Sequence, residues 1–196
     1  MLPVFAGRLL DVGGGVGATS AALKTAGRAS EAIVVDHVEH ERALGIDKTF
    51  VGDLEDLALI DGVIAESGTF DTILCLDVLE HLRDPWMIVR RLHYALREGG
   101  SLVISLPNVN HLSVVAPLVL RGKFELVDSG ILDRTHLRWF TRSSAIDLAT
   151  CSGLALEAIQ SNIYSRAHRL ANRLTLGLFS RFFAVQYVIC VRRRQP

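Results

Sequence analysis

Apolar runs typical of buried strands alternate along most of this chain with segments of helical periodicity. Because parallel strands are joined by crossover helices, this alternation predicts a parallel sheet with helices on both faces. The last crossover helix has Asp84 as its N-cap and Pro85 at its first position. Strands are predicted at residues 8–12, 32–36, 49–52, 70–76 and 101–106, and helices at 18–26, 40–44, 58–66 and from Pro85 to the paired glycines 99 and 100.

The pattern changes after a further predicted helix at 141–151. Two more apolar runs, 154–159 and 183–191, are separated by 161–182, and they predict an antiparallel pair at one edge of the sheet. The expected fold class is α/β, a Rossmann-like, doubly wound and mostly parallel seven-stranded sheet with an antiparallel edge hairpin. We find no repeat or linker in the sequence. We therefore expect one domain over residues 1–196, with its core at 7–160 and a C-terminal helix plus edge strand at 161–196.

Composition narrows the classes of function. Lys and Arg number 21, as do Asp and Glu, so net charge gives no reason to expect a nucleic-acid partner. The mean hydropathy of +0.32 is high, yet no apolar run reaches the roughly 18 uncharged residues of a spanning helix. Cys75, Cys151 and Cys190 lie far apart, which favours free thiols in a reducing compartment. The N-terminus does not resemble a signal peptide, and we expect a cytoplasmic protein.

A glycine-rich loop, Asp11-Val12-Gly13-Gly14-Gly15-Val16-Gly17, lies at the first strand-to-helix junction. Glycines there allow positive φ and let a ligand approach backbone N–H groups at a helix N-terminus. Asp36 ends the second strand 19 residues beyond the loop, where a carboxylate can accept both hydroxyls of a ribose. The combination predicts a nucleotide-like cofactor, and Gly13, Gly15 and Ala18 also fit a dinucleotide fingerprint.

Two further stretches make the prediction more specific. Phe50-Val51-Gly52-Asp53-Leu54 offers a carboxylate for an adenine amine, and Leu76-Asp77-Val78-Leu79-Glu80-His81-Leu82-Arg83-Asp84-Pro85 follows the fourth strand. With these motifs the chain resembles the class-I S-adenosylmethionine-dependent methyltransferases over most of residues 7–160. It is most similar to the branch of ubiquinone-biosynthesis-type O-methyltransferases and bacterial small-molecule and saccharide methyltransferases.

The resemblance implies S-adenosylmethionine as cofactor and S-adenosylhomocysteine as product. It assigns the methionine portion to the glycine loop, the ribose to Asp36, and the adenine to Asp53 and Leu54. The cofactor-binding residues that it implies are Asp11, Gly13, Gly14, Gly15, Asp36, His37, Asp53, Leu54, Leu76 and Asp77. Members of the family carry helices before the first strand that cover the cofactor. Here about seven residues precede it, so we expect a trimmed domain or a cover supplied from elsewhere.

The long connection at 107–140 is the expected acceptor site, because long insertions at this edge of a sheet are commonly functional. Near its end, Asp133, His136, Arg138 and an aromatic residue are clustered. We predict His136 as a general base with Asp133 orienting it, and His81 as the second candidate. The alternatives are that His81 only braces the next helix and that the connection is a salt-bridged loop.

No metal site is predicted, since the run Asp36-His37-x-x-His40-Glu41 has no third cluster at ligand spacing. Four arginines, Arg166, Arg169, Arg173 and Arg181, alternate with leucines and phenylalanines. Such a basic amphipathic helix can lie on anionic lipid, but packing on the sheet or on a second copy in a homodimer is the commoner outcome.

The hypothesis from sequence is therefore a methyltransferase acting on a small hydroxylated or carbohydrate-like acceptor, by O-methylation. One alternative is an NAD-dependent oxidoreductase, which the absence of a Tyr-x-x-x-Lys pair disfavours. A second alternative is a non-catalytic cofactor-binding subunit of a larger assembly.

Overall fold

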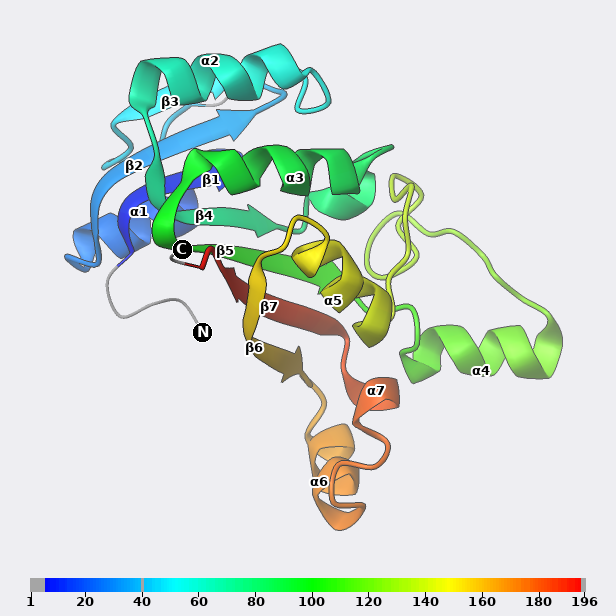
Figure 1. The fold of residues 1–196 in the computed structure, drawn as a ribbon. Coiled ribbons are helices and arrows are strands. Elements are labelled where there is room, and N and C mark those ends of the chain that lie inside the picture. Colours follow the sequence, from blue (N-terminus) through cyan, green and yellow to red (C-terminus); the bar gives the residue numbers. More distant parts are fainter. Residues whose placement is uncertain (1–5, 40, 195–196) are drawn as a thin grey trace.

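The computed structural model describes residues 6–39 and 41–194. Its centre is a seven-stranded sheet in the order β3-β2-β1-β4-β5-β7-β6 (Figure 1). The strands are β1 Gly7–Val12, β2 Ala29–Asp36, β3 Lys48–Val51, β4 Phe70–Leu76, β5 Leu96–Pro107, β6 Ala155–Asn162 and β7 Gln186–Arg192. The helices are α1 Ala18–Thr25, α2 Leu57–Ser67, α3 Pro85–Ala95, α4 Leu112–Arg121, α5 Arg142–Thr150, α6 Arg166–Leu174 and α7 Ser180–Phe183, with a 3₁₀ turn at Leu79–His81.

The first five strands pair in parallel, as the sequence predicts. The predicted antiparallel pair is also confirmed, but its second strand is not at the edge. Strand β7 is antiparallel to both β5 and β6, which leaves β6 at the edge. This reversal pairs Pro107, at the end of β5, with Gln186, at the start of β7. Gln186 therefore lies at the edge where the parallel strands end.

Apolar residues are buried on both faces of the sheet, as expected for a mostly parallel sheet. Helices α2, α3 and α5 cover one face, where residues such as Ile60, Leu92 and Leu148 pack against the strands. Helix α1 lies on the other face, where Leu23 packs with residues such as Leu9 and Leu74. The burial on both faces accounts for the high mean hydropathy.

Three segments differ from the prediction. The helix predicted to reach Gly99 and Gly100 ends at Ala95, and residues 96–100 begin β5. Helix α4 forms within the 107–140 connection, although Pro117 lies inside it and argues against a helix in the sequence. The short helix predicted at 40–44 is not formed at residues 41–44, and residue 40 lies outside the described residues. Within the residues that the structure describes, none of the helices is both long and apolar enough to span a membrane.

The basic helix α6 does not pack on the sheet, although this packing was one of the two outcomes expected to be commoner. None of its residues is buried, and it lies beside α7 below the sheet in Figure 1. Arg166, Arg169 and Arg173 are exposed, together with Leu170 and Leu174. The alternatives of a second copy or a lipid surface for this helix stay predictions.

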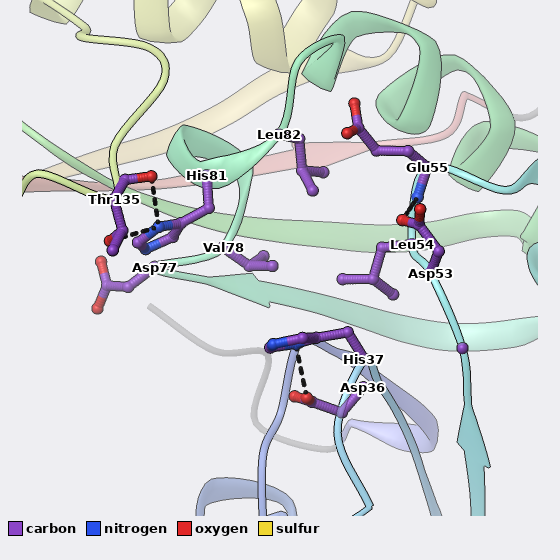
Figure 2. A pocket seen from close by; sticks show the side chains of 12 residues that line it. Asp36, His37, Asp53, Leu54, Glu55, Asp77, Val78, His81, Leu82 and Thr135 are labelled. Carbon is purple, nitrogen blue, oxygen red and sulfur yellow. Dashed lines mark hydrogen bonds and ion pairs between the residues drawn. The ribbon is translucent and has the colours of Figure 1, made fainter.

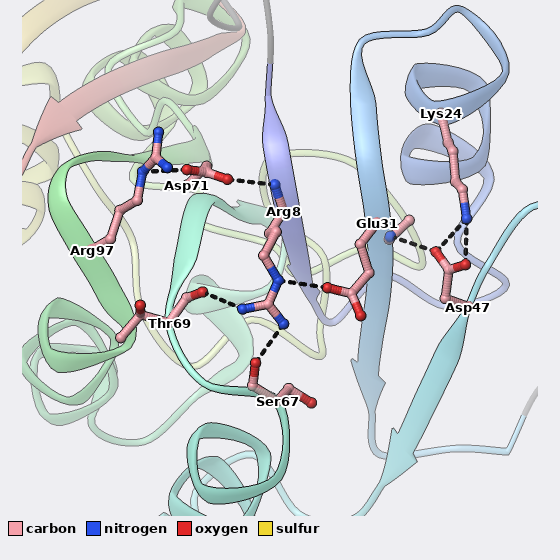
Figure 3. A network of polar contacts seen from close by, with 9 residues as sticks. Arg8, Lys24, Glu31, Asp47, Ser67, Thr69, Asp71 and Arg97 are labelled. Atoms are coloured by element: carbon pink, nitrogen blue, oxygen red, sulfur yellow. Dashed lines mark hydrogen bonds and ion pairs between the residues drawn. The ribbon is translucent and has the colours of Figure 1, made fainter.

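A network of polar contacts fastens the opposite edge of the sheet, where the parallel strands begin (Figure 3). The Arg8 guanidinium in β1 donates to Glu31 of β2 and to the backbone carbonyls of Ser67 and Thr69 before β4. The Arg8 backbone N–H donates to Asp71, which also pairs with Arg97. Three strands that are distant in sequence are thus held in register at one point.

We expect Arg8→Met to destabilise the fold without affecting ligand binding at the other edge. The variant keeps an apolar stem but loses three hydrogen-bond partners in a half-exposed setting. The free energy of unfolding should fall by roughly 1–2 kcal/mol in urea titrations. Arg90→Met, on the exposed face of α3, is the matched control and should change stability by less than about 0.5 kcal/mol. Equal stability of the two variants would contradict the role given to this network.

Candidate functional site

A cavity of about 770 Å³ opens where the parallel strands end (Figure 2). Its lining comes from the loops after β1, β2, β3 and β4, together with one residue of the 107–140 connection. The lining residues are Gly13, Asp36, His37, Gly52, Asp53, Leu54, Glu55, Asp77, Val78, His81, Leu82 and Thr135. This is the edge at which open α/β sheets bind their ligands.

Six of the ten residues that the resemblance assigns to the cofactor face this one cavity. They are Gly13, Asp36, His37, Asp53, Leu54 and Asp77. The other four, Asp11, Gly14, Gly15 and Leu76, are not part of its lining.

The glycine loop needs its glycines for two different reasons. Gly13 has φ +71°, and a Cβ there would lie 2.4 Å from the Val78 side chain. Gly15 has φ +55°, and nothing lies within 4 Å of the position that its Cβ would take. Backbone sterics therefore exclude most side chains at both positions, and Gly15 in addition leaves space open beside the loop.

Asp36 holds this loop in place. Its Oδ2 accepts the Gly15 N–H at 2.8 Å, and its Oδ1 accepts the Val38 N–H at 3.1 Å. The exposed ring of His37 lies 3.1 Å from the same Oδ1. Asp36 itself is only 5% exposed. The carboxylate predicted to bind a ribose thus also connects the end of β2 to the glycine loop.

Asp11 is buried next to the glycine loop. It is 3% exposed, and its Oδ2 accepts the Ser20 hydroxyl hydrogen at 2.5 Å. Burial raises the pKa of Asp11 from 3.8 to about 6, the Ser20 hydrogen bond lowers it, and the nearby charge of Asp36 raises it. A Cβ on Gly14 would lie 2.6 Å from the carboxyl carbon of Asp11, so a side chain at position 14 would clash with this carboxyl group.

The far side of the cavity is formed after β3. Leu54 is 4% exposed and offers an apolar surface, while Asp53 is exposed and accepts the Glu55 N–H. Glu55 in turn accepts the N–H groups of Arg83 and Asp84, which fixes the start of α3 against this loop. The pairing of an apolar wall with a carboxylate suits an adenine ring.

Asp77 lies at the centre of the site and has unusual backbone geometry. Its φ of 54° is in the left-handed region, which non-glycine residues rarely adopt. The conformation is held because the Asp77 N–H donates to Ser105, and its Oδ1 accepts from Ser105 and from Gln186. Sequence analysis finds Asp77 but not Gln186, because only the reversed direction of β7 brings Gln186 to this edge.

A second cavity of about 270 Å³ adjoins the first and shares Asp77 and His81 with it. Glu80 and His136 also line it, and the rings of His81 and His136 lie 4.8 Å apart in an edge-to-face arrangement. The Glu80 carbonyl accepts the N–H groups of Leu137 and Arg138, which ties the 107–140 connection to the turn after β4. The two histidines predicted as rival bases therefore lie in one cluster.

The predicted pairing of Asp133 with His136 is not what the structure shows. His136 Nδ1 lies 3.1 Å from the Ile131 carbonyl oxygen, and Asp133 Oδ1 accepts both the N–H and the hydroxyl of Thr135. The Thr135 hydroxyl and carbonyl oxygens then face His81 Nδ1, at 3.1 and 3.3 Å. Asp133 thus positions His81 through Thr135. The tight turn at residues 133–136 directs its side chain to Thr135, which lies only two positions away.

Glu80 is a site residue that sequence analysis missed. It is 1% exposed, and burial raises its pKa to about 8, with the charge of Asp77 adding to the shift. Burial also lowers the pKa of His136, so its neutral form is favoured near pH 7. The sequence contained one indication of this role, since Glu80 directly precedes the candidate base His81 in an otherwise apolar turn.

Comparison with known proteins identifies the family. Residues 5–159 match the model of a family described as a methyltransferase domain. The chain belongs to this methyltransferase family. A ubiquinone biosynthesis O-methyltransferase of Xylella fastidiosa (strain 9a5c) is 33% identical over 167 residues, covering 80% of this chain and 67% of that protein. The protein of the same name from Xanthomonas oryzae pv. oryzae (strain PXO99A) is 28% identical, covering 76% of this chain and 66% of its own length.

Solved structures support the fold of this methyltransferase domain. An S-adenosylmethionine-dependent methyltransferase from Mesorhizobium loti superposes with a TM-score of 0.64, covering 98% of this chain and 94% of that chain at 19% identity. The chain spans about two thirds of the length of the curated relatives that it matches.

The charge of the first cavity fits S-adenosylmethionine, the cofactor that this methyltransferase family implies. Its lining includes four carboxylates, from Asp36, Asp53, Glu55 and Asp77, and the described lining residues include no Lys or Arg. That balance favours a ligand with a sulfonium and an ammonium group and disfavours the pyrophosphate of NAD. The dinucleotide alternative therefore loses its main support, although the glycine loop alone fits it.

We expect Asp36→Ala to weaken the binding of S-adenosylmethionine to the methyltransferase domain at least about tenfold. It removes the carboxylate that is predicted to accept the ribose hydroxyls, and it releases the Gly15 N–H. Calorimetric titration measures the effect, and circular dichroism checks the fold. Asp147→Ala, on the exposed face of α5, is the matched control. An unchanged Kd in a folded Asp36→Ala protein would exclude Asp36 from the site.

The raised pKa of Asp11 predicts a pH-dependent cost in stability. The folded state binds the proton more tightly than the unfolded state, so this group's contribution to stability is lost as pH rises from about 4 to about 6. Asp11→Asn keeps an acceptor for Ser20 and stays neutral. Relative to wild type, its free energy of unfolding should rise by up to about 3 kcal/mol between pH 4 and pH 7.5.

Urea titrations at a series of pH values test this prediction, with Asp147→Asn as a control whose difference from wild type should not vary in the same way. A difference between Asp11→Asn and wild type that is constant over this range would show that Asp11 ionises as readily in the folded chain as in the unfolded one.

Proposed function

We propose that this chain is an S-adenosylmethionine-dependent methyltransferase that methylates a hydroxyl oxygen of a small acceptor bound in the second cavity. The observation that carries this proposal is the junction of the two cavities. An acidic cavity suited to a cationic donor meets, at Asp77 and His81, a smaller cavity that is lined by histidines and carboxylates.

The residues of the first cavity bind and orient the donor. Bound S-adenosylmethionine supplies a methyl group that is already activated by the sulfonium charge. Asp36 accepts the ribose hydroxyls, Leu54 and Asp53 hold the adenine, and Asp77 provides negative charge at the junction with the second cavity. Much of the rate enhancement then comes from alignment of donor and acceptor rather than from protein chemistry.

The residues of the second cavity act on the acceptor. A hydroxyl must lose its proton as its oxygen takes the methyl group, and this proton needs an acceptor. A carbonyl oxygen can only accept a hydrogen bond, so the Ile131 carbonyl keeps the hydrogen of His136 on Nδ1 and leaves a lone pair on Nε2. The Thr135 carbonyl does the same for His81.

The lining of the second cavity supports a hydroxylated acceptor, phenolic or carbohydrate-like. Tyr164 offers an aromatic face and Gln186 an amide, while Pro107 and Ile131 supply apolar surface. The curated relatives named for ubiquinone biosynthesis are O-methyltransferases, which supports oxygen as the methylated atom.

We expect His136→Gln and His81→Gln to lower kcat. His136→Gln should leave the Kd for S-adenosylmethionine within about twofold, because His136, unlike His81, does not line the first cavity. A histidine that takes the acceptor proton should cost roughly 10²–10⁴ in kcat when replaced, and the other histidine should cost less. Transfer of a labelled methyl group from S-adenosylmethionine to a panel of phenols, catechols and saccharides provides the measurement.

The matched control is His93→Gln at the end of α3, which should leave kcat unchanged. A loss smaller than about fivefold for both site variants would mean that orientation alone explains the catalysis. Titration with NAD tests the oxidoreductase alternative. Tight cofactor binding with no transfer to any acceptor would favour the non-catalytic subunit.

A further inference from the structure

Glu80, His81 and His136 form a cluster whose composition is that of a metal site. One ligand atom from each residue lies within 4.8 Å of the other two. Within residues 6–39 and 41–194, this is the one group of three or more such residues brought this close. The three side chains come from the turn after β4 and from the 107–140 connection, so only the tertiary structure brings them together.

Both histidines are held as metal-binding histidines usually are. Such a histidine donates its second ring N–H to a carbonyl or carboxylate, which fixes the tautomer and the ring orientation. His136 Nδ1 faces the Ile131 carbonyl, and His81 Nδ1 faces the Thr135 carbonyl and hydroxyl oxygens. The Thr135 hydroxyl donates its hydrogen to Asp133, so its oxygen can only accept a hydrogen bond from His81. Each ring therefore presents the lone pair of its Nε2.

Glu80 adds a carboxylate that its protein surroundings do not satisfy. Its side chain is 1% exposed, and its Oε2 has no hydrogen-bond partner among the described residues. A carboxyl oxygen buried this deeply without a partner is costly, because buried polar groups in proteins are normally hydrogen-bonded or bound to a metal. A cation between Glu80 and the two histidines would remove this cost.

The charges around the cluster also call for a cation. Two carboxylates, from Asp77 and Asp133, line the second cavity beside the buried Glu80, and its described lining residues include no Lys or Arg. The cavity is therefore negative without a positively charged ligand. Asp77 also lines the cavity proposed for the cationic methyl donor, but Asp133 does not, so the donor leaves the charge of Asp133 uncompensated.

We propose that Glu80, His81 and His136 bind a divalent transition-metal ion such as Mn²⁺, Fe²⁺ or Zn²⁺ beside the acceptor cavity. Two histidines and one carboxylate are a ligand set that these ions favour, and three protein ligands leave coordination positions open. Bonds of about 2.1 Å in a tetrahedral arrangement place ligand atoms about 3.4 Å apart. Small side-chain rotations therefore close the cluster from its present spacing.

The role of this cation in catalysis rests on the proposed function. The cation gives the site a second way to activate the acceptor. A hydroxyl oxygen bound at an open position loses its proton to water more readily. Its O–H bond breaks, its oxygen forms the new O–CH₃ bond, and the C–S bond of the donor breaks. The products are the methyl ether, S-adenosylhomocysteine and one proton. The histidines then serve as ligands rather than as bases.

Direct binding of MnCl₂ to the full chain tests the site without any acceptor. Electron paramagnetic resonance of free Mn²⁺ during titration should show one ion bound per chain. Mn²⁺ is preferable to Zn²⁺ here because it has little affinity for the thiols of Cys75, Cys151 and Cys190. Glu80→Gln and His136→Gln should each weaken this binding at least about tenfold, since each removes one ligand, and Glu80→Gln does so without changing the side-chain shape.

The matched control is His168→Gln. Its ring lies 5.7 Å from that of His111, so these two histidines are also close together. Among the described residues, they do not form a cluster of three potential ligands with a carboxylate. The Mn²⁺ affinity of this variant should equal that of wild type. Stoichiometric binding that is unaffected by Glu80→Gln, or no binding by wild type at millimolar Mn²⁺, would overturn the proposal. Thermal unfolding with and without MnCl₂ shows whether each variant is folded.

An activity measurement separates this proposal from the proposed function. Removal of metal with a chelator should abolish methyl transfer, and MnCl₂ should restore it, while the Kd for S-adenosylmethionine stays the same. One Mn²⁺ bound without methylation of any acceptor supports the metal site and argues against the proposed function. Full activity in the chelator, with kcat still lost in His136→Gln, overturns the metal site and leaves a histidine base in place.

Discussion

The parallel pairing of β1, β2, β3 and β4 brings four loops to one edge of the sheet, and the whole candidate site depends on this alignment. Each strand ends with a residue that has a polar or conformational role: the glycine loop after β1, Asp36 on β2, Asp53 after β3 and Asp77 after β4. Backbone hydrogen bonds along the ladders fix the spacing of these residues, and packing on both faces makes the frame rigid. The cofactor side of the site is therefore built on strands that are packed on both faces.

The acceptor side depends on a different kind of contact. The Glu80 carbonyl accepts two backbone N–H groups from the 107–140 connection, and this tether brings His136 to His81. Asp77 links the two sides because its strained backbone is held by Ser105 of β5 and Gln186 of β7. A strained residue at the meeting point of two cavities is consistent with a position fixed for function rather than for stability.

The cofactor residues could be predicted because they follow strands that short stretches of sequence are enough to identify. A glycine-rich turn after an apolar run, and acids at the ends of the next strands, are short-range patterns. The acceptor side could not be predicted in the same way. Glu80 and His136 are distant in sequence, and no periodic pattern links them. The partner of Asp133 could not be predicted either. The residue types in the sequence favour His136 as its partner, but the geometry of the turn directs the Asp133 side chain to Thr135.

Sequence by itself determined the alternation of strands and helices, the parallel sheet, and the acidic, glycine-rich character of the cofactor edge. These features follow from local periodicity and from residue types at strand ends, which change little with the surroundings. Tertiary structure alone decided that β7 lies between β5 and β6, that α4 forms despite Pro117, and that a buried glutamate joins two histidines beside the second cavity. Each of these depends on contacts between segments far apart in the chain, and the free energy of such contacts is not encoded in any one segment.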